Sequence, residues 1–166
     1  MKSLVLLVAS LCVLNAGYIK EALSAKDDHN KLAQIYEDAC DKEKKASGCY
    51  NLAVLYSRGD GNVKKDEAKA AMLYEKACDQ NFSMACSNLG YVYENGEGVE
   101  KDYAKAKAYY EMACANEAGI GCDNLGFLYV YGQGVDQNLT KATKLYEQAC
   151  IYDYEKGCNN LSLIHI

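Results

Sequence analysis

The stretch C-A-N-E-A-G-I-G-C-D-N-L-G-F-L-Y-V-Y-G-Q-G-V, residues 114–135, decides the fold of this chain because it occurs three times. Residues 78–99 repeat it at the same length as C-D-Q-N-F-S-M-A-C-S-N-L-G-Y-V-Y-E-N-G-E-G-V. Residues 40–63 repeat it again, with one extra residue in each of two loops. A motif that returns at a fixed interval is typical of a solenoid, in which each copy buries its apolar face against its neighbours.

The cysteines give the period of this repeat. The first cysteines of successive copies are residues 40, 78, 114 and 150, so the steps are 38, 36 and 36 residues. An interval of this size is typical of repeats that contain two helices. The sequence therefore predicts an all-α solenoid with a period of about 36 residues.

Each copy contains two helical patterns, which we name helix A and helix B. Helix A includes the matching hexamers 51–56, 88–93 and 124–129, and a pair of glycines follows each hexamer. Glycine adopts positive φ at little cost, so helix A can end there and the chain can turn. Helix B is the alanine-rich segment that ends at the next cysteine, at 68–78, 104–114 and 140–150, with the end of a preceding copy at 32–40.

The first sixteen residues have the pattern of a secretory signal. Lys2 is the basic start, residues 4–14 form an apolar run, and Ala16 is the small residue before the expected cleavage. The run is too short to cross a bilayer. Leu11 before Cys12 differs from a lipoprotein signal, so we expect a secreted or periplasmic protein with no membrane anchor in the mature chain.

The charge of the chain excludes one class of partner. The net charge is −5, and the pI near 5.1 gives no electrostatic reason to bind nucleic acid. We expect one domain with these parts: signal peptide 1–16, N-terminal segment with a B-type helix 17–45, repeats 46–82, 83–118 and 119–154, and the start of a further repeat 155–166.

The pattern N-L-G-x-x-Y-x-x-G-x-G-V, followed by K-A-x-x-x-Y-x-x-A-C, resembles the Sel-1-like repeat family, a relative of tetratricopeptide repeats. The cysteine pair in every copy resembles the exported, cysteine-rich branch of that family from bacteria. The resemblance covers about residues 27–161. It implies a right-handed superhelix of α/α hairpins, each closed by its own disulfide. It also implies roles at the cell envelope or in contact with host cells, and it brings a β-lactamase label.

Eight cysteines remain after the expected cleavage, and an even number in an exported chain indicates a disulfide framework. A helical hairpin brings the two cysteines of each pair together, whereas successive pairs lie a whole repeat apart. The expected bridges are Cys40–Cys49, Cys78–Cys86, Cys114–Cys122 and Cys150–Cys158.

The sequence favours a binding module over an enzyme. A serine β-lactamase needs Ser-x-x-Lys and Lys-Thr-Gly, and neither string occurs. The two histidines, His29 and His165, lie at opposite ends of the sequence, so we expect no metal and no cofactor. Weak β-lactam hydrolysis is the alternative function, and it rests on the family resemblance alone.

An asparagine lies two residues after the second cysteine of every pair. In related helical arrays helix A lines the concave groove, where amides can both donate to and accept from the backbone of an extended peptide. We therefore predict a groove for a peptide, a cell-wall fragment or a host protein, lined by Asn51, Asn88 and Asn124. The alternative is that these asparagines, together with Asn160, bond to the neighbouring repeat.

Two further features concern modification and the carboxyl end. The N-x-Ser/Thr strings at Asn81 and Asn138 fall in expected loops after an upstream acid, which resembles a bacterial glycosylation acceptor, although chance matches are common. A third string begins at Asn160. Residues 161–166 match the translated sequence of a library adaptor, so we expect 155–166 to be the start of a truncated repeat.

Overall fold

The computed structural model describes residues 18–25, 28–60 and 62–164 of the chain. The expected signal peptide, with Cys12, lies outside the described residues, as do the last two residues of the expected adaptor segment. The described residues are helical throughout apart from their turns and loops, and they contain no strand. The helices are α2 (His29–Asp41), α3 (Ala46–Arg58), α4 (Glu67–Cys78), α5 (Ser83–Asn95), α6 (Tyr103–Ala115), α7 (Gly119–Tyr131), α8 (Leu139–Ile151) and α9 (Glu155–Ile164).

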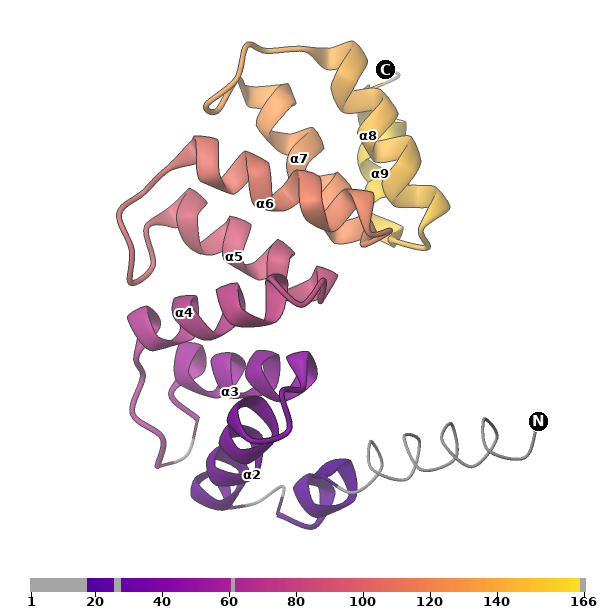
Figure 1. The fold of residues 1–166 in the computed structure, drawn as a ribbon. Coiled ribbons are helices and arrows are strands. Elements are labelled where there is room, and N and C mark those ends of the chain that lie inside the picture. The colour runs from indigo at the N-terminus through magenta and orange to yellow at the C-terminus, as the bar shows by residue number, and fades with distance from the viewer. Residues whose placement is uncertain (1–17, 26–27, 61, 165–166) are drawn as a thin grey trace, which may run out of the picture.

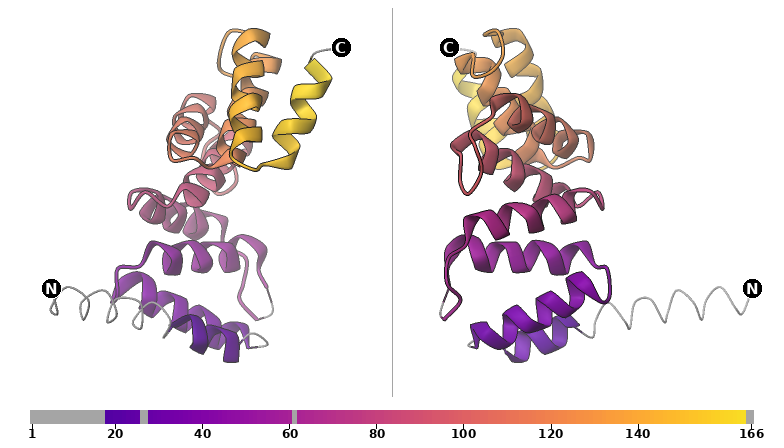
Figure 2. Two further views of the ribbon diagram at one scale, coloured as in Figure 1. Left: turned by 90° about the vertical axis from the view of Figure 1, so that its right-hand side faces the viewer. Right: turned by 60° about the vertical axis from the view of Figure 1, so that its left-hand side comes forward.

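The helices form a curved, twisted stack in which each helix packs on the helices before and after it (Figure 1). The predicted A helices are α3, α5, α7 and α9, and the predicted B helices are α2, α4, α6 and α8. The direction of the helix axes turns along the stack. In the left view of Figure 2, α3 runs across the page and α8 stands nearly upright. The A helices also contact one another, α5 with α7 and α7 with α9, which indicates that they lie on the inner side of the curve.

The A helices end where the glycine pairs predict, and the structure adds the caps that begin the B helices. Asp66, Asp102 and Asn138 cap the first turns of α4, α6 and α8 by accepting hydrogen bonds from backbone N–H groups. The A helices α3, α5 and α7 each end at a glycine with φ of 71°, 76° and 65°. These signals place the same two-helix unit three times along the chain.

Each disulfide joins helix B of one repeat to helix A of the next. The bonds are Cys40–Cys49, Cys78–Cys86, Cys114–Cys122 and Cys150–Cys158, with Cα atoms 4.5 to 4.7 Å apart. The hairpin that a bridge closes is therefore formed by two neighbouring repeats, and the disulfides cross the boundaries that the sequence analysis expected after residues 82 and 118. The predicted fold class, a disulfide-stapled all-α solenoid, is confirmed.

Within a repeat, helix A approaches helix B closely at a glycine. A Cβ atom at Gly90 would lie 2.5 Å from the ring of Tyr110, and one at Gly126 would lie 2.7 Å from the ring of Tyr146. Tyr110 is fully buried, and its hydroxyl donates a hydrogen bond to Glu94 at 2.6 Å. Burial, with this carboxylate as a second cause, raises the pKa of Tyr110 far above its usual value.

Residues 18–24 form a further helix that the sequence analysis did not predict. Tyr18 is buried, donates a hydrogen bond to Ser47 Oγ at 2.7 Å, and packs edge-on against Tyr36. This helix closes the N-terminal end of the stack against α2 and α3. None of the helices in the described part of the chain is both long and apolar enough to span a membrane.

Candidate functional site

The A helices carry two columns of residues at equivalent positions. The asparagine column consists of Asn51, Asn88, Asn124 and Asn160, each half-buried on α3, α5, α7 or α9. Three residues further along each helix lies the apolar column, Val54, Tyr91, Phe127 and Leu163, of which Leu163 falls in the expected adaptor segment 161–166. Residues three apart share one face of a helix, so the two columns run side by side across the array.

Much of the apolar column is open to solvent. Tyr91 is 50% exposed, Phe127 is 40% exposed and Leu163 is 68% exposed. Tyr131, one turn after Phe127, is also exposed, and the two ring centroids lie 4.4 Å apart. A row of exposed aromatic and aliphatic side chains on one face of a repeat array is typical of a binding surface.

The structure gives the asparagines different surroundings. Asn160 Nδ2 donates a hydrogen bond to Asp123 Oδ1 of the preceding A helix at 2.8 Å. Asn88 lines a pocket together with Tyr74 of the preceding B helix, where burial raises the pKa of the Tyr74 hydroxyl and the Asn88 side chain acts in the opposite direction. At these two positions the contact with a neighbouring repeat, the alternative that the sequence left open, is present.

Asn51 and Asn124 differ from these two. Asn51 lines a small pocket together with Tyr18, Ile19 and Leu23 of the N-terminal helix. For Asn124, the residue equivalent to the acceptor Asp123 is Ser87 on α5, which is buried and whose Oγ has no hydrogen-bond partner among the described residues. The predicted groove residues therefore lie on one face, but they are not equally available to a ligand.

A pocket of about 320 Å³ lies between α3 and α5 at one end of the columns. Asn88 and Tyr91 line it from α5, Tyr50 and Arg58 line it from α3, and Glu97 lines it from the following loop. Arg58 is the only arginine in the chain. Sequence reasoning missed this pocket because its walls come from two different repeats.

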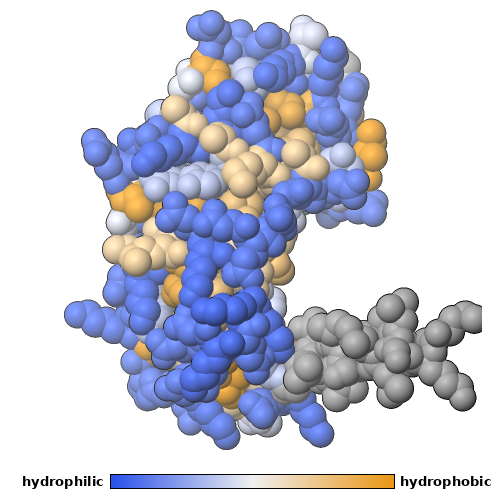
Figure 3. All heavy atoms as spheres, viewed as in Figure 1, coloured by the Kyte–Doolittle hydropathy of each residue, from blue (hydrophilic) through white to orange (hydrophobic). Residues whose placement is uncertain are grey.

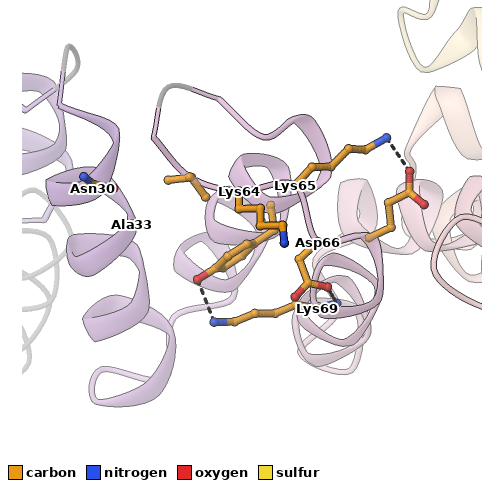
Figure 4. Close-up of a pocket in the computed structure, with 9 residues that line it drawn as sticks. Asn30, Ala33, Lys64, Lys65, Asp66 and Lys69 are labelled. Atoms are coloured by element: carbon orange, nitrogen blue, oxygen red, sulfur yellow. Dashed lines mark hydrogen bonds and ion pairs between the residues drawn. The ribbon is translucent and has the colours of Figure 1, made fainter.

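A larger hollow of about 650 Å³ lies at the loop edge of the array, between α2 and the segment that leads into α4 (Figure 4). Lys69 Nζ donates to the hydroxyl of Tyr56 at 2.8 Å, which raises the pKa of Lys69, and Lys65 pairs with Glu67 at 2.5 Å. Lys64 and Asp66 also line this hollow, so its charges are mixed, and Asp66 accepts a hydrogen bond from the backbone N–H of Lys69.

A lysine ammonium group over the ring of a tyrosine in helix A recurs in the three repeats, and in the first of them Lys69 Nζ lies 4.2 Å from the centre of the Tyr56 ring. Lys141 Nζ donates to Tyr129 Oη at 2.6 Å, and it lies 4.2 Å from the centre of the same ring. In the second repeat, Lys105 Nζ lies 4.8 Å from the centre of the Tyr93 ring. These pairs tie helix A to the start of helix B, so we assign them to the scaffold.

The two candidate glycosylation residues are exposed, and both have a structural role. Asn81 lies in the turn between α4 and α5 with φ of 61°, where other repeats place Lys44, Glu117 and Asp153 at positive φ. Asn138 caps α8 by accepting from the Lys141 backbone N–H at 2.9 Å. The third asparagine of this kind, Asn160, has its Nδ2 atom engaged with Asp123.

Hydrophobic residues also gather elsewhere on the surface. On the face seen in Figure 3, pale orange residues gather around the middle of the array, and separate orange residues lie nearer to both ends. The structure gathers no group of three metal-ligating side chains within residues 18–25, 28–60 and 62–164. Of the surfaces described, the two columns on the A helices have the most extended geometry for a ligand.

The fold and the cysteine bridges define a class of protein, the disulfide-stapled α/α solenoids. More particularly, the chain belongs to the Sel1 repeat family, because the model of the Sel1 repeat matches residues 46–82, 83–117 and 120–151. None of the curated proteins matches the chain significantly.

Solved structures support the same assignment. Cysteine-rich protein B of Helicobacter pylori is 35% identical, with 82% of this chain and 96% of that chain covered and a TM-score of 0.64. A Sel1 repeat protein from Oxalobacter formigenes is 27% identical, with 78% of this chain covered and a TM-score of 0.72. A protective antigen of uropathogenic Escherichia coli, 22% identical with 80% of this chain covered, shares the fold with a TM-score of 0.72. This chain spans 52% of the Oxalobacter chain and 28% of the Escherichia chain.

Proposed function

We propose that this protein is a secreted or periplasmic binding module that holds an extended peptide along the inner face of its A helices. Four disulfides are typical of an oxidising compartment, which supports a location outside the cytoplasm. Solenoids of this kind use their concave surfaces for binding, and the columns lie on the helices that crowd together on the inner side of the curve.

The observation that carries this proposal is the pairing of an amide column with an exposed apolar column. The side-chain amide of asparagine offers an NH2 group that donates to a backbone C=O and a carbonyl oxygen that accepts from a backbone N–H. Exposed rings such as Tyr91 and Phe127 offer apolar surface to the side chains of that peptide. The repeated register suits a linear ligand better than a compact one, so we favour a peptide over a cell-wall fragment or a folded host protein.

Fluorescence anisotropy with labelled octapeptides tests this proposal. The peptides carry apolar residues at alternate positions, and the protein is the full, disulfide-bonded chain. We expect Phe127→Ala to weaken binding by about 10-fold or more, because exposed aromatic side chains often dominate binding energies. Met72→Ala is the matched control, since Met72 is an exposed apolar residue on the B helix α4. Equal losses from both variants would contradict a site on the A helices.

The alternative of β-lactam hydrolysis is tested with the same preparation. Turnover of a chromogenic cephalosporin that persists in a chelator and disappears on a single substitution on the A helices would establish an enzyme. We expect no such turnover, because the sequence lacks the serine β-lactamase strings.

A further inference from the structure

The pocket between α3 and α5 differs in charge from the rest of the asparagine and apolar columns. The eight column residues carry no ionisable acid or base apart from the tyrosine hydroxyl, whereas Arg58 and Glu97 both line this pocket. Every ion pair that the structure shows among its described residues uses a lysine, and Arg58 takes part in none of them. A guanidinium without a carboxylate partner therefore lies at one end of a neutral surface.

The inner face also stops near this pocket. Beyond α3, the N-terminal helix places Tyr18, Ile19 and Leu23 around Asn51. Tyr18 is fixed there by its hydrogen bond to Ser47. A peptide that runs along α9, α7 and α5 would reach Arg58 and then meet this helix, so an end of the peptide would lie in the pocket.

We infer that the pocket at Arg58 binds the C-terminal carboxylate of an extended, apolar peptide, an inference that rests on the proposed function. The planar guanidinium donates two parallel hydrogen bonds to a carboxylate, a geometry that lysine does not provide. The side chains of Tyr50, Tyr74 and Asn88 line the same space, and the Tyr50 hydroxyl supplies a further donor. The pocket, about 320 Å³, is in the size range of sites for small ligand groups.

Glu97 lets the direction of a change in peptide affinity test this inference. Its carboxylate lines the pocket and would repel a carboxylate ligand, whereas it would attract the amino end of a peptide. Neutralising Arg58 should therefore weaken binding, and neutralising Glu97 should strengthen it. Recognition of a peptide amino terminus would reverse both effects.

The experiment compares labelled apolar octapeptides that carry either a free acid or an amide at the C-terminus. For the unmodified protein we expect the acid to bind about 10-fold or more tightly than the amide, because hydrogen bonds to charged groups are among the stronger ones. In Arg58→Gln the two forms should bind within about 2-fold of each other, and Arg58→Lys should lose part of the preference. Lys144→Gln on α8 removes the same charge from an exposed B-helix position and should leave the preference unchanged.

The outcomes separate this inference from the function on which it rests. If the acid and the amide bind equally well to the unmodified protein, the pocket does not recognise a terminal carboxylate. The proposed function as a peptide-binding module is then unaffected. A preference that survives in Arg58→Gln, or a loss of affinity in Glu97→Gln, also overturns the inference. If an amidated peptide with an internal aspartate binds as tightly as the free acid, the pocket recognises side-chain carboxylates and not the C-terminus. If neither form binds, the proposed function and the inference both fail.

Discussion

The side-chain amide of Asn160 donates a hydrogen bond to the buried carboxylate of Asp123, with 2.8 Å between Nδ2 and Oδ1, across 37 residues of sequence. Burial raises the pKa of Asp123, while Asn160 and Lys156 act in the opposite direction. The contact joins α7 to α9, so the Asp123 carboxyl group is buried where two successive repeats meet.

The first prediction is a pH dependence that originates at Asp123. An acid whose pKa is raised in the folded state holds its proton more tightly there than in the unfolded chain. Its contribution to stability is therefore fully present below the unfolded pKa and is lost as the pH rises through the raised folded value. We expect Asp123→Asn to be more stable than the unmodified protein at neutral pH and to show little gain at acid pH, measured by urea unfolding. Lower stability of this variant at neutral pH would show that the ionised carboxylate is well satisfied.

The second prediction concerns the donor of the same contact. Asn160→Ala leaves the buried carboxylate without this hydrogen bond, which should lower the free energy of unfolding by about 1 to 3 kcal/mol. Asn124→Ala, at the equivalent position beside a serine, should lower it by less and should instead weaken peptide binding. Thermal unfolding and peptide binding measured on both variants check this contrast, and the reverse order would assign Asn124 to the scaffold.

The third prediction tests the close contact of helices A and B. Alanine is intrinsically better than glycine in a helix by about 1 kcal/mol, so Gly90→Ala would stabilise an isolated helix. In the protein the new methyl group would meet the Tyr110 ring at 2.5 Å, and we expect a net loss of about 1 to 3 kcal/mol in urea unfolding. The loss should persist in a Tyr110→Phe background, because the ring and not its hydroxyl makes the contact. A net gain in stability would show that the helices separate freely.

The fourth prediction concerns the staples between repeats. Replacing Cys78 and Cys86 together by alanine removes a bridge that encloses seven residues and should cost roughly 2 to 3 kcal/mol of stability. The bridge joins α4 to α5, so its loss should also divide the unfolding transition between the two ends of the array. Removal of the Cys150–Cys158 bridge should leave the first repeats unaffected. Peptide mapping under non-reducing conditions provides the control, because any crossed pairing would contradict the four local bridges.

The fifth prediction separates the two parts of the lysine–tyrosine contact. Tyr129→Phe removes the hydrogen bond from Lys141 but keeps the ring beneath its ammonium group, and it should cost about 1 kcal/mol. Lys141→Met removes both interactions and should cost more. Thermal unfolding at low and high salt checks the assignment, because the contact is partly buried and should respond weakly to salt. Equal unfolding temperatures for the two variants would contradict a ring contribution.

Much of the fold could be predicted because its signals are local. The cysteine pairs and the glycine pairs each involve residues close together in the chain, and the same signals recur in the next repeat. The helix at residues 18–24 was missed because it lies outside that period and is held by Tyr18 against Ser47, 29 residues away. The same limit hid the lysine–tyrosine contacts, since a lysine near the start of helix B reads as an exposed charge.

The sequence by itself determined the repeat, the two helices of each unit and the four cysteine pairs, because each depends on residues close together in the chain. The tertiary structure alone decided what each equivalent residue touches. Asn124 and Asn160 occupy the same position in successive repeats, yet the preceding repeat offers a buried serine to one and a carboxylate to the other. The stacking of a whole repeat brings those partners into reach, so the scaffold and the binding surface differ through contacts between residues about 37 positions apart.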